Sequence, residues 1–435
     1  MRTGPVRGAI PTLVLLSLIG SGGQAVASSS VDQLLRQSQR QIGRHPDAAL
    51  GYYRLGDAYV QKARETGDLT YLGLAETALV KSLSIAPRLG GAARHLAYVL
   101  YLRHAFAEAA EQAQRAIDLD PTDGYAYGVL GDAALETGRY AEARQAYERM
   151  IGLDASLYGL SRLAGLKSLE GDPEGAIADL ERAIAEGQAN ERPTESIAWA
   201  QWQLGAEQAA LGRLAASETN YRAALQTYPG YHRALAGLAH VRAAEGRYPE
   251  AIALYEQAIA VIPQADYVVA LGDVQAKAGR RDAARQQYEL VEYIGRLSAL
   301  NRVLYNRELA YFYADHDTRL DQALDLARRE LEVRRDIYGY DVLAWALYKN
   351  GRFAEAREAM LVALRLGTRD ARLFFHAGLI ERAAGHADAA RAYLRHALAI
   401  NPGFHVLQAD EARRVLAEPD LGSGETSGRE ARNDE

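Results

Sequence analysis

The sequence predicts an all-α protein, a solenoid of about ten antiparallel helix pairs, and two observations lead to this prediction. The tripeptide Leu-Gly-Asp recurs inside apolar-periodic stretches, and aligning on its small residue gives a column with a period of about 34 residues. A second column of small residues follows about twelve positions later. Small residues let two helix backbones approach closely, so each unit is expected to be one pair of packed helices. The first column comprises Gly56, Ala97, Gly131, Ala164, Gly205, Ala239, Gly272, Ala310, Ala344 and Gly378.

Residues 1–27 have the pattern of an export signal peptide. Arg2 and Arg7 precede an apolar run over residues 10–19, and a small-x-small sequence ends at Ala27. The run is shorter than the roughly 20 residues that span a bilayer. We therefore expect cleavage before Ser28, no stable membrane span afterwards, and a periplasmic or extracellular protein. An uncleaved anchor is the alternative interpretation.

Glycines and prolines fall where helix pairs must turn. Seven glycines are expected to end first helices in a left-handed cap, namely Gly138, Gly171, Gly212, Gly246, Gly279, Gly351 and Gly385. Prolines such as Pro229 and Pro263 then separate one pair from the next. The expected organisation is a leading helix and linker over 28–47, the array over 48–402, a C-terminal capping helix over 403–418 and a disordered tail over 419–435. Within the array, residues 187–196 are interpreted as an inserted linker, and residues 295–338 fit the period least well.

These columns resemble the tetratricopeptide repeat, a helix-turn-helix unit of about 34 residues. The clearest unit spans residues 235–263, where Leu238, Ala239, Gly246 and Tyr248 lie on the pattern. The resemblance covers roughly residues 48–402. It implies a right-handed superhelix whose first helices line the concave face, and it implies protein or peptide partners bound there.

Composition and motifs give no sign of catalysis. The 435 residues carry a net charge of -6 and include no cysteine, which excludes thiol catalysis and cysteine-ligated metals and makes broad nucleic-acid binding unexpected. No phosphate-binding loop, nucleophile elbow or metal-binding histidine pair is present. Asp315, His316 and Asp317 are interpreted as a solvated turn. We expect no enzyme activity, no cofactor, no metal ligand and no nucleic-acid partner.

Aromatic and arginine side chains concentrate at positions expected to face the concave side. This composition is typical of binding hot spots, because it combines large rigid area with polar groups. Packing between neighbouring first helices is the structural alternative for each residue. The candidate partner-binding residues are Tyr98, Tyr101, Tyr125, Tyr158, Trp199, Trp202, Arg233, Tyr311, Trp345, Tyr348, Arg372 and Phe375.

Two functional interpretations follow from the sequence. The first is a non-catalytic scaffold of the cell envelope that binds a peptide or a partner helix in the concave groove. The second is a structural component that associates with copies of itself to form a homo-oligomer. The identity of the partner is not encoded in any motif of the chain.

Overall fold

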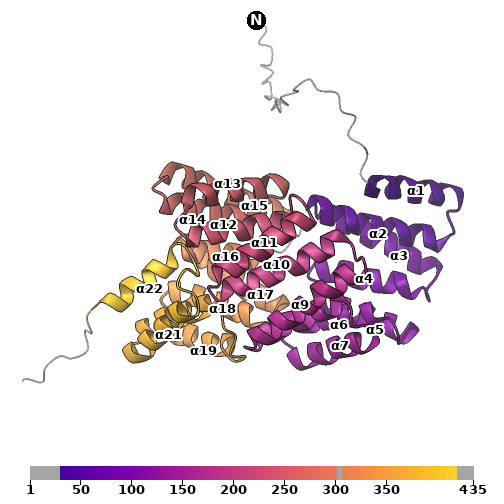
Figure 1. The fold of residues 1–435 in the computed structure, drawn as a ribbon. Helices are drawn as coiled ribbons and strands as arrows, with labels where there is room; N and C mark the ends of the chain where they lie inside the picture. Colours follow the sequence, from indigo (N-terminus) through magenta and orange to yellow (C-terminus); the bar gives the residue numbers. More distant parts are fainter. Residues whose placement is uncertain (1–29, 301–305, 419–435) are drawn as a thin grey trace, which may run out of the picture.

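The computed structural model describes residues 30–300 and 306–418, all of whose regular elements are α-helices (Figure 1). The predicted signal over 1–27 and the predicted tail over 419–435 lie outside the described residues. The chain begins with α1 (Ser30–Arg44), continues through antiparallel helix pairs and ends with α22 (Gln408–Ala417). No helix in this part of the chain is long and apolar enough to cross a membrane.

Ten helix pairs lie between α1 and α22, each consisting of a first and a second helix. They are α2 (Ala49–Thr66) and α3 (Thr70–Ile85), α4 (Gly90–Leu102) and α5 (Phe106–Leu119), α6 (Gly124–Glu136) and α7 (Tyr140–Leu153), α8 (Leu157–Leu169) and α9 (Pro173–Ala189), α10 (Thr194–Ala210) and α11 (Leu214–Thr227), α12 (His232–Ala244) and α13 (Tyr248–Val261), α14 (Ala265–Lys277) and α15 (Arg281–Leu300), α16 (Asn306–Asp315) and α17 (Leu320–Val333), α18 (Ile337–Lys349) and α19 (Phe353–Ala363), and α20 (Ala371–Ala383) and α21 (Ala387–Ile400).

The small-residue column lets the two helices of a pair approach closely, as predicted. Each of its glycines makes room for a large side chain of the second helix. A β-carbon at Gly205 would stand 2.6 Å from Tyr221 Cε1, closer than any side chain allows. All seven predicted cap glycines have a positive φ, between 70° for Gly212 and 87° for Gly385. The left-handed conformation lets the chain reverse without a steric penalty.

Two predicted irregularities take a different form in the structure. The linker predicted over 187–196 is mostly helical, because α9 and α10 are each lengthened and only residues 190–193 connect them. The segment 295–338 contains the end of α15, which extends to Leu300, and one helix pair, α16 and α17, whose first helix is only 10 residues long. An extended second helix therefore precedes a shortened first helix.

Successive turns of the solenoid touch along a seam, which we define as the contact of the turns over 136–140, 169–171 and 209–212 with the linkers over 334–337, 366–368 and 401–403. The backbone N–H of Arg335 donates to Glu136 O at 3.1 Å. The backbone N–H of Ile337 donates to Tyr140 Oη at 2.9 Å, and Asn401 Nδ2 donates to Ala209 O at 2.8 Å. In the view of Figure 1, α17 and α18 lie close to α9 and α10, and the bonds above show that the contact runs through turns and linkers. The first helices therefore face an interior that is enclosed along this side.

Candidate functional site: the inner face of the solenoid

The inner face is built from the first helices of successive pairs, which pack side by side from α2 to α20. All twelve candidate residues lie on these helices. Tyr98, Tyr101, Tyr125, Tyr158, Trp199, Trp202, Arg233, Tyr311, Tyr348 and Arg372 are half-buried, whereas Trp345 and Phe375 are only 2% and 0% exposed. The structure therefore divides the candidates into a part that solvent reaches and a part that belongs to the core.

Tyr125 is the centre of a group of rings and cations on α4, α6 and α8. The ring of Tyr98 meets it edge-on with the centroids 5.9 Å apart, and the guanidinium groups of Arg94 and Arg162 lie 5.5 and 5.7 Å from its centroid. Both arginines are fixed by carboxylates, since Arg94 pairs with Asp123 at 3.1 Å and Arg162 with Asp132 at 2.9 Å. The ring is thus held in place with its neighbours already ordered.

Trp202 and Arg233 form the next group along the inner face. The Arg233 guanidinium lies 5.0 Å from the Trp202 ring centroid, within the range of a cation–π interaction. No carboxylate of the described residues lies within ion-pair distance of Arg233, in contrast to Arg94 and Arg162. Trp199 lies one turn before Trp202 and packs against the cores on both sides of it. Arg233 can therefore accept an external anionic group without breaking an internal ion pair.

Tyr158 joins the first helices of two successive pairs, and Arg64 joins the first helices of two distant pairs. Tyr158 Oη lies 3.2 Å from Ser196 Oγ, which joins α8 to α10. Arg64 Nη2 lies 2.5 Å from Glu195 Oε2, so that the end of α2 contacts the beginning of α10. These contacts hold the wall formed by the first five pairs together.

The candidates on α16, α18 and α20 bind mainly one another. Trp345 stacks on His376 with the centroids 4.1 Å apart, and its Nε1–H donates to Asp315 Oδ1 at 2.8 Å. Arg372 lies 4.0 Å from the ring centroid of Tyr311 and pairs with Asp315 at 2.7 Å. Phe375 packs at 5.9 Å from the same Trp345 ring, and Tyr348 stacks on it at 4.9 Å. The packing alternative therefore describes Trp345 and Phe375, which join pairs 8 to 10.

The interpretation of residues 315–317 as a solvated turn was wrong for Asp315 and His316. Asp315 accepts hydrogen bonds from Trp345, Arg372 and Gln408. His316 Nε2 lies 2.8 Å from Asp273 Oδ1. Burial lowers the His316 pKa, but the hydrogen bond and the charge of Asp273, together with the Phe312 carbonyl and Asp315, outweigh burial and raise the pKa overall. The partners lie 30 or more residues away in sequence, and the local pattern gave no sign of them.

Asp273 is the centre of a buried cluster that joins the middle of the solenoid to its C-terminal end. It accepts from Tyr288 Oη at 2.8 Å and lies 3.4 Å from His405 Nε2 as well as close to His316. Burial opposes its ionisation, but the two histidines outweigh burial and lower the Asp273 pKa. This cluster is structural, because the Asp273 side chain is almost completely buried.

Carboxylates and arginines also line the seam. Arg334 Nε lies 3.0 Å from Glu136 Oε2, and Arg307 pairs with Glu330 at 3.1 Å and with Asp336 at 2.6 Å. Burial raises the Glu136 pKa in spite of Arg334. Partnered buried charges of this kind specify one arrangement, because removing a single partner leaves an unpaired charge.

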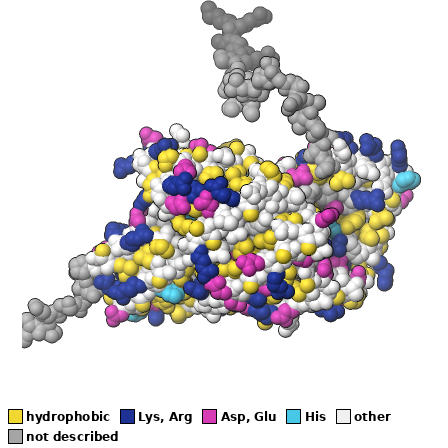
Figure 2. Space-filling view, in the orientation of Figure 1, with side chains coloured by type: hydrophobic (Ala, Val, Ile, Leu, Met, Phe, Trp, Pro, Cys, Tyr) yellow, Lys and Arg dark blue, Asp and Glu magenta, His cyan; other side chains and the backbone are white. Residues whose placement is uncertain are grey.

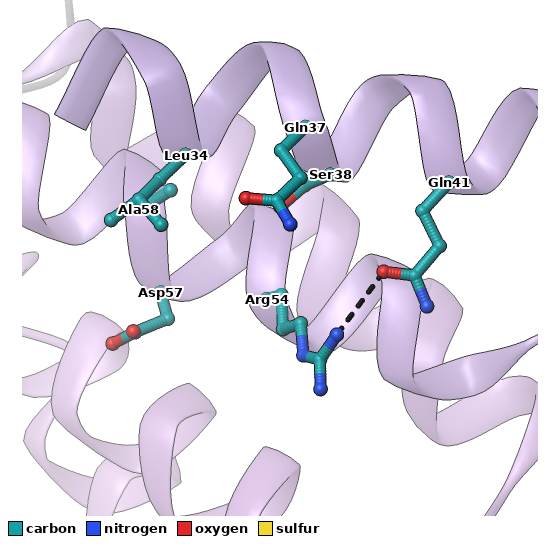
Figure 3. A pocket seen from close by; sticks show the side chains of 7 residues that line it. All are labelled: Leu34, Gln37, Ser38, Gln41, Arg54, Asp57 and Ala58. Atoms are coloured by element: carbon teal, nitrogen blue, oxygen red, sulfur yellow. Dashed lines mark hydrogen bonds between the residues drawn. The ribbon is translucent and has the colours of Figure 1, made fainter. Parts of the chain in front are cut away.

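Two cavities of the described part of the chain lie beside first helices. One of about 340 Å³ opens on the inner face between α14 and α16, where Asp266, Arg307, Glu308 and Tyr311 contribute to its lining. The other, of about 280 Å³, lies between α1 and α2 (Figure 3). No group of three or more histidine or acidic side chains in the described residues could hold a metal ion.

Comparison with known proteins identifies the family. The tetratricopeptide repeat model matches residues 90–157, 203–267, 238–299 and 342–403, which together span more than half of the chain. The chain belongs to the tetratricopeptide repeat family. No curated protein matches the sequence.

Several solved structures are similar to this tetratricopeptide repeat chain at low identity. PilW, described as a type IV pilus biogenesis factor, is 18% identical with a TM-score of 0.40 and covers 47% of this chain and 93% of its own. Human IFIT1, solved as a dimer with PPP-AAAA, is 16% identical with a TM-score of 0.48 and coverages of 78% and 77%. Yeast Tom70 is 12% identical with a TM-score of 0.38 and coverages of 88% and 92%. At these identities the likeness concerns the fold alone.

Proposed function

We propose that the protein is a non-catalytic protein–protein interaction scaffold of the cell envelope, which binds an extended peptide or a partner helix along the inner face of pairs 2 to 6. The observation that carries this proposal is the Trp202–Arg233 pair, a half-buried aromatic ring with an arginine that has no internal ion pair. Membership of the repeat family supports binding of proteins in general.

The chemistry of this inner face favours a partner with acidic and apolar side chains. The rings of Tyr98, Tyr125 and Trp202 offer rigid area that loses little conformational entropy on binding. Arg233 offers a planar guanidinium that can bind a carboxylate through two hydrogen bonds. Binding is then distributed over several pairs instead of one pocket.

A peptide selection tests this proposal. The purified chain is offered a random peptide library, with the Trp202→Ala, Arg233→Gln variant as the counter-selection target and circular dichroism as the check of folding. We expect peptides that bind the parent only and that are enriched in acidic and aromatic or aliphatic residues. Recovery of the same peptides on both proteins would contradict the proposed location.

The envelope location is proposed from the N-terminal sequence pattern. Its test is expression in a Gram-negative cell, fractionation, and mass spectrometry of the N-terminus. A chain that begins at Ser28 in the periplasmic fraction supports export with cleavage, and a full-length chain in the cytoplasmic fraction refutes it.

Self-association is the second candidate function, and α15 carries the observation that favours it. Leu290, Tyr293 and Leu297 lie on one face of this helix and are 36%, 51% and 41% exposed. Apolar side chains at this spacing form a stripe that a second helix can cover. Sedimentation velocity over a concentration series tests this candidate, and a Leu290→Glu, Leu297→Glu variant should abolish any dimer.

A further inference from the structure

We infer that α1 is an electrostatic docking element for a membrane surface that carries anionic lipid headgroups. The inference rests on a stripe of three arginines, Arg36, Arg40 and Arg44, which we call the α1 stripe. They are spaced four residues apart, so that they lie one above another on one side of the helix. The stripe extends over about 12 Å, since each residue adds about 1.5 Å of helix.

The stripe lies on the side of α1 that faces away from the protein. Val31 and Ser38 are 0% and 4% exposed and face the body. Figure 3 shows Leu34, Gln37, Ser38 and Gln41 on the side of α1 nearest α2, with Gln41 bound to Arg54 at 3.3 Å. Arg36, Arg40 and Arg44 are all exposed. In Figure 2, arginine and lysine side chains gather at the end of the molecule that α1 forms.

The positive charge of the stripe has no internal partner. None of the three arginines forms an ion pair within the described residues, and the acidic residue of α1, Asp32, pairs with Lys62 at 2.8 Å. Elsewhere on the surface, several arginines pair with an acid three residues away, as Arg139 does with Glu142 and Arg352 with Glu355. On α1 the neighbours of Arg40 one turn away are arginines, and like charges at this spacing destabilise a helix.

A membrane is the occupant that fits this arrangement best. The stripe is straight and lies on the outermost helix of this end of the chain, so a flat surface can contact all three guanidinium groups together (Figure 1). The guanidinium group binds phosphate oxygens through two parallel hydrogen bonds. In sequence, the apolar run over residues 10–19 ends eleven positions before α1 begins, and such a run enters a membrane during export, which brings α1 close to the membrane surface before the expected cleavage.

Vesicle partitioning of the full chain tests the inference. The probes are vesicles of one part phosphatidylglycerol to three parts phosphatidylcholine, with pure phosphatidylcholine vesicles as the reference. Any contribution of the apolar N-terminal run is common to both kinds of vesicle and cancels in the ratio of the two partition coefficients.

The stripe variant is Arg36→Gln, Arg40→Gln, Arg44→Gln. The matched control is Arg280→Gln, Arg328→Gln, Arg395→Gln, which removes the same charge from three exposed arginines that share no helix face.

We expect the stripe variant to lower this ratio on the order of 100-fold at low salt, since each basic residue at an anionic surface contributes about fivefold. The control variant should stay within about twofold of the parent. The difference should shrink at about 0.5 M salt, where the Debye length falls to a few ångströms. Equal ratios for the stripe and control variants would overturn the inference. Equal vesicle ratios together with a loss of heparin binding in the stripe variant alone would also overturn it, and would assign the stripe to a soluble polyanion.

Discussion

The backbone N–H of Arg335 donates to the carbonyl oxygen of Glu136 at 3.1 Å, and this bond joins the turn after α6 to the linker before α18. A solenoid whose repeats contact only their sequence neighbours has no bond of this kind. The seam therefore adds long-range cooperativity to an architecture that is otherwise local. It also encloses one side of the inner face, so that the proposed partner would meet a preformed surface.

The seam predicts a specific difference between two cap glycines. Gly138 and Gly246 both have a φ of 75°, but a β-carbon at Gly138 would collide with the carbonyl oxygen of Arg335, whereas nothing lies within 4 Å of one at Gly246. Gly246→Ala should lower the unfolding free energy by about 1–2 kcal/mol, because alanine is strained in the left-handed backbone conformation. Gly138→Ala should lower the unfolding free energy by at least about 1 kcal/mol more, because its β-carbon also collides with the Arg335 carbonyl oxygen. Urea unfolding of both variants measures the difference, and equal losses would show that the seam is open in solution.

Tyr140→Phe should destabilise the protein without changing its shape. The variant removes the oxygen that accepts the N–H of Ile337 at 2.9 Å in a buried position, which should cost about 1–3 kcal/mol of unfolding free energy. Tyr293→Phe is the matched control, because the Tyr293 side chain is 51% exposed. Hydrogen exchange should show faster exchange of the Ile337 amide in the Tyr140 variant alone. Slow exchange in both variants would contradict the assigned bond.

Acid should destabilise the protein through His240. Burial, together with the nearby His405, lowers the His240 pKa to about 4, from an ordinary value of 6.5. The unfolded chain therefore binds a proton that the folded chain does not bind between about pH 4 and pH 6.5, and the unfolding free energy rises with pH across this window. The His240 contribution is about 1.4 kcal/mol per pH unit within the window. His240→Gln should reduce the slope of the unfolding free energy against pH between pH 6.5 and 4.5, measured by urea unfolding. Part of the slope should remain, because burial also lowers the pKa of His104 and of His232. An unchanged slope would refute the assignment to His240.

Two tryptophans of the inner face should respond differently to truncation. Trp345 is 2% exposed and bonded to Asp315, so that Trp345→Ala should cost about 3–5 kcal/mol of unfolding free energy. Trp202 is half-buried with Arg233 on its ring, and Trp202→Ala should cost clearly less. Thermal unfolding followed by circular dichroism compares the two. A larger loss for Trp202 would reverse the division of the inner face into a binding part and a core part.

The repeat period predicted much of the fold because each pair depends on local spacing. Gly205 and the cap glycines follow directly from the need for close helix crossings and left-handed turns. The seam could not be predicted, because Arg335 and Glu136 meet only through the pitch of the superhelix. For the same reason the sequence did not separate Trp345 from Trp202. Both lie at inner positions of their repeats, and Trp345 is buried because Asp315, His376, Phe375 and Tyr348 surround it.

The central claim is that the inner face of pairs 2 to 6 binds a peptide, and calorimetric titration with a selected peptide tests it most directly. The titrated proteins are the parent, Trp202→Ala, Arg233→Gln and the outer-face control Tyr293→Ala, all with matching circular dichroism. The account predicts that each inner-face substitution weakens binding by at least about tenfold, as hot-spot truncation does. It also predicts no change for Tyr293→Ala. Equal affinity for all four proteins, or a loss confined to Tyr293→Ala, would contradict the account and favour the outer face of α15 as the binding surface.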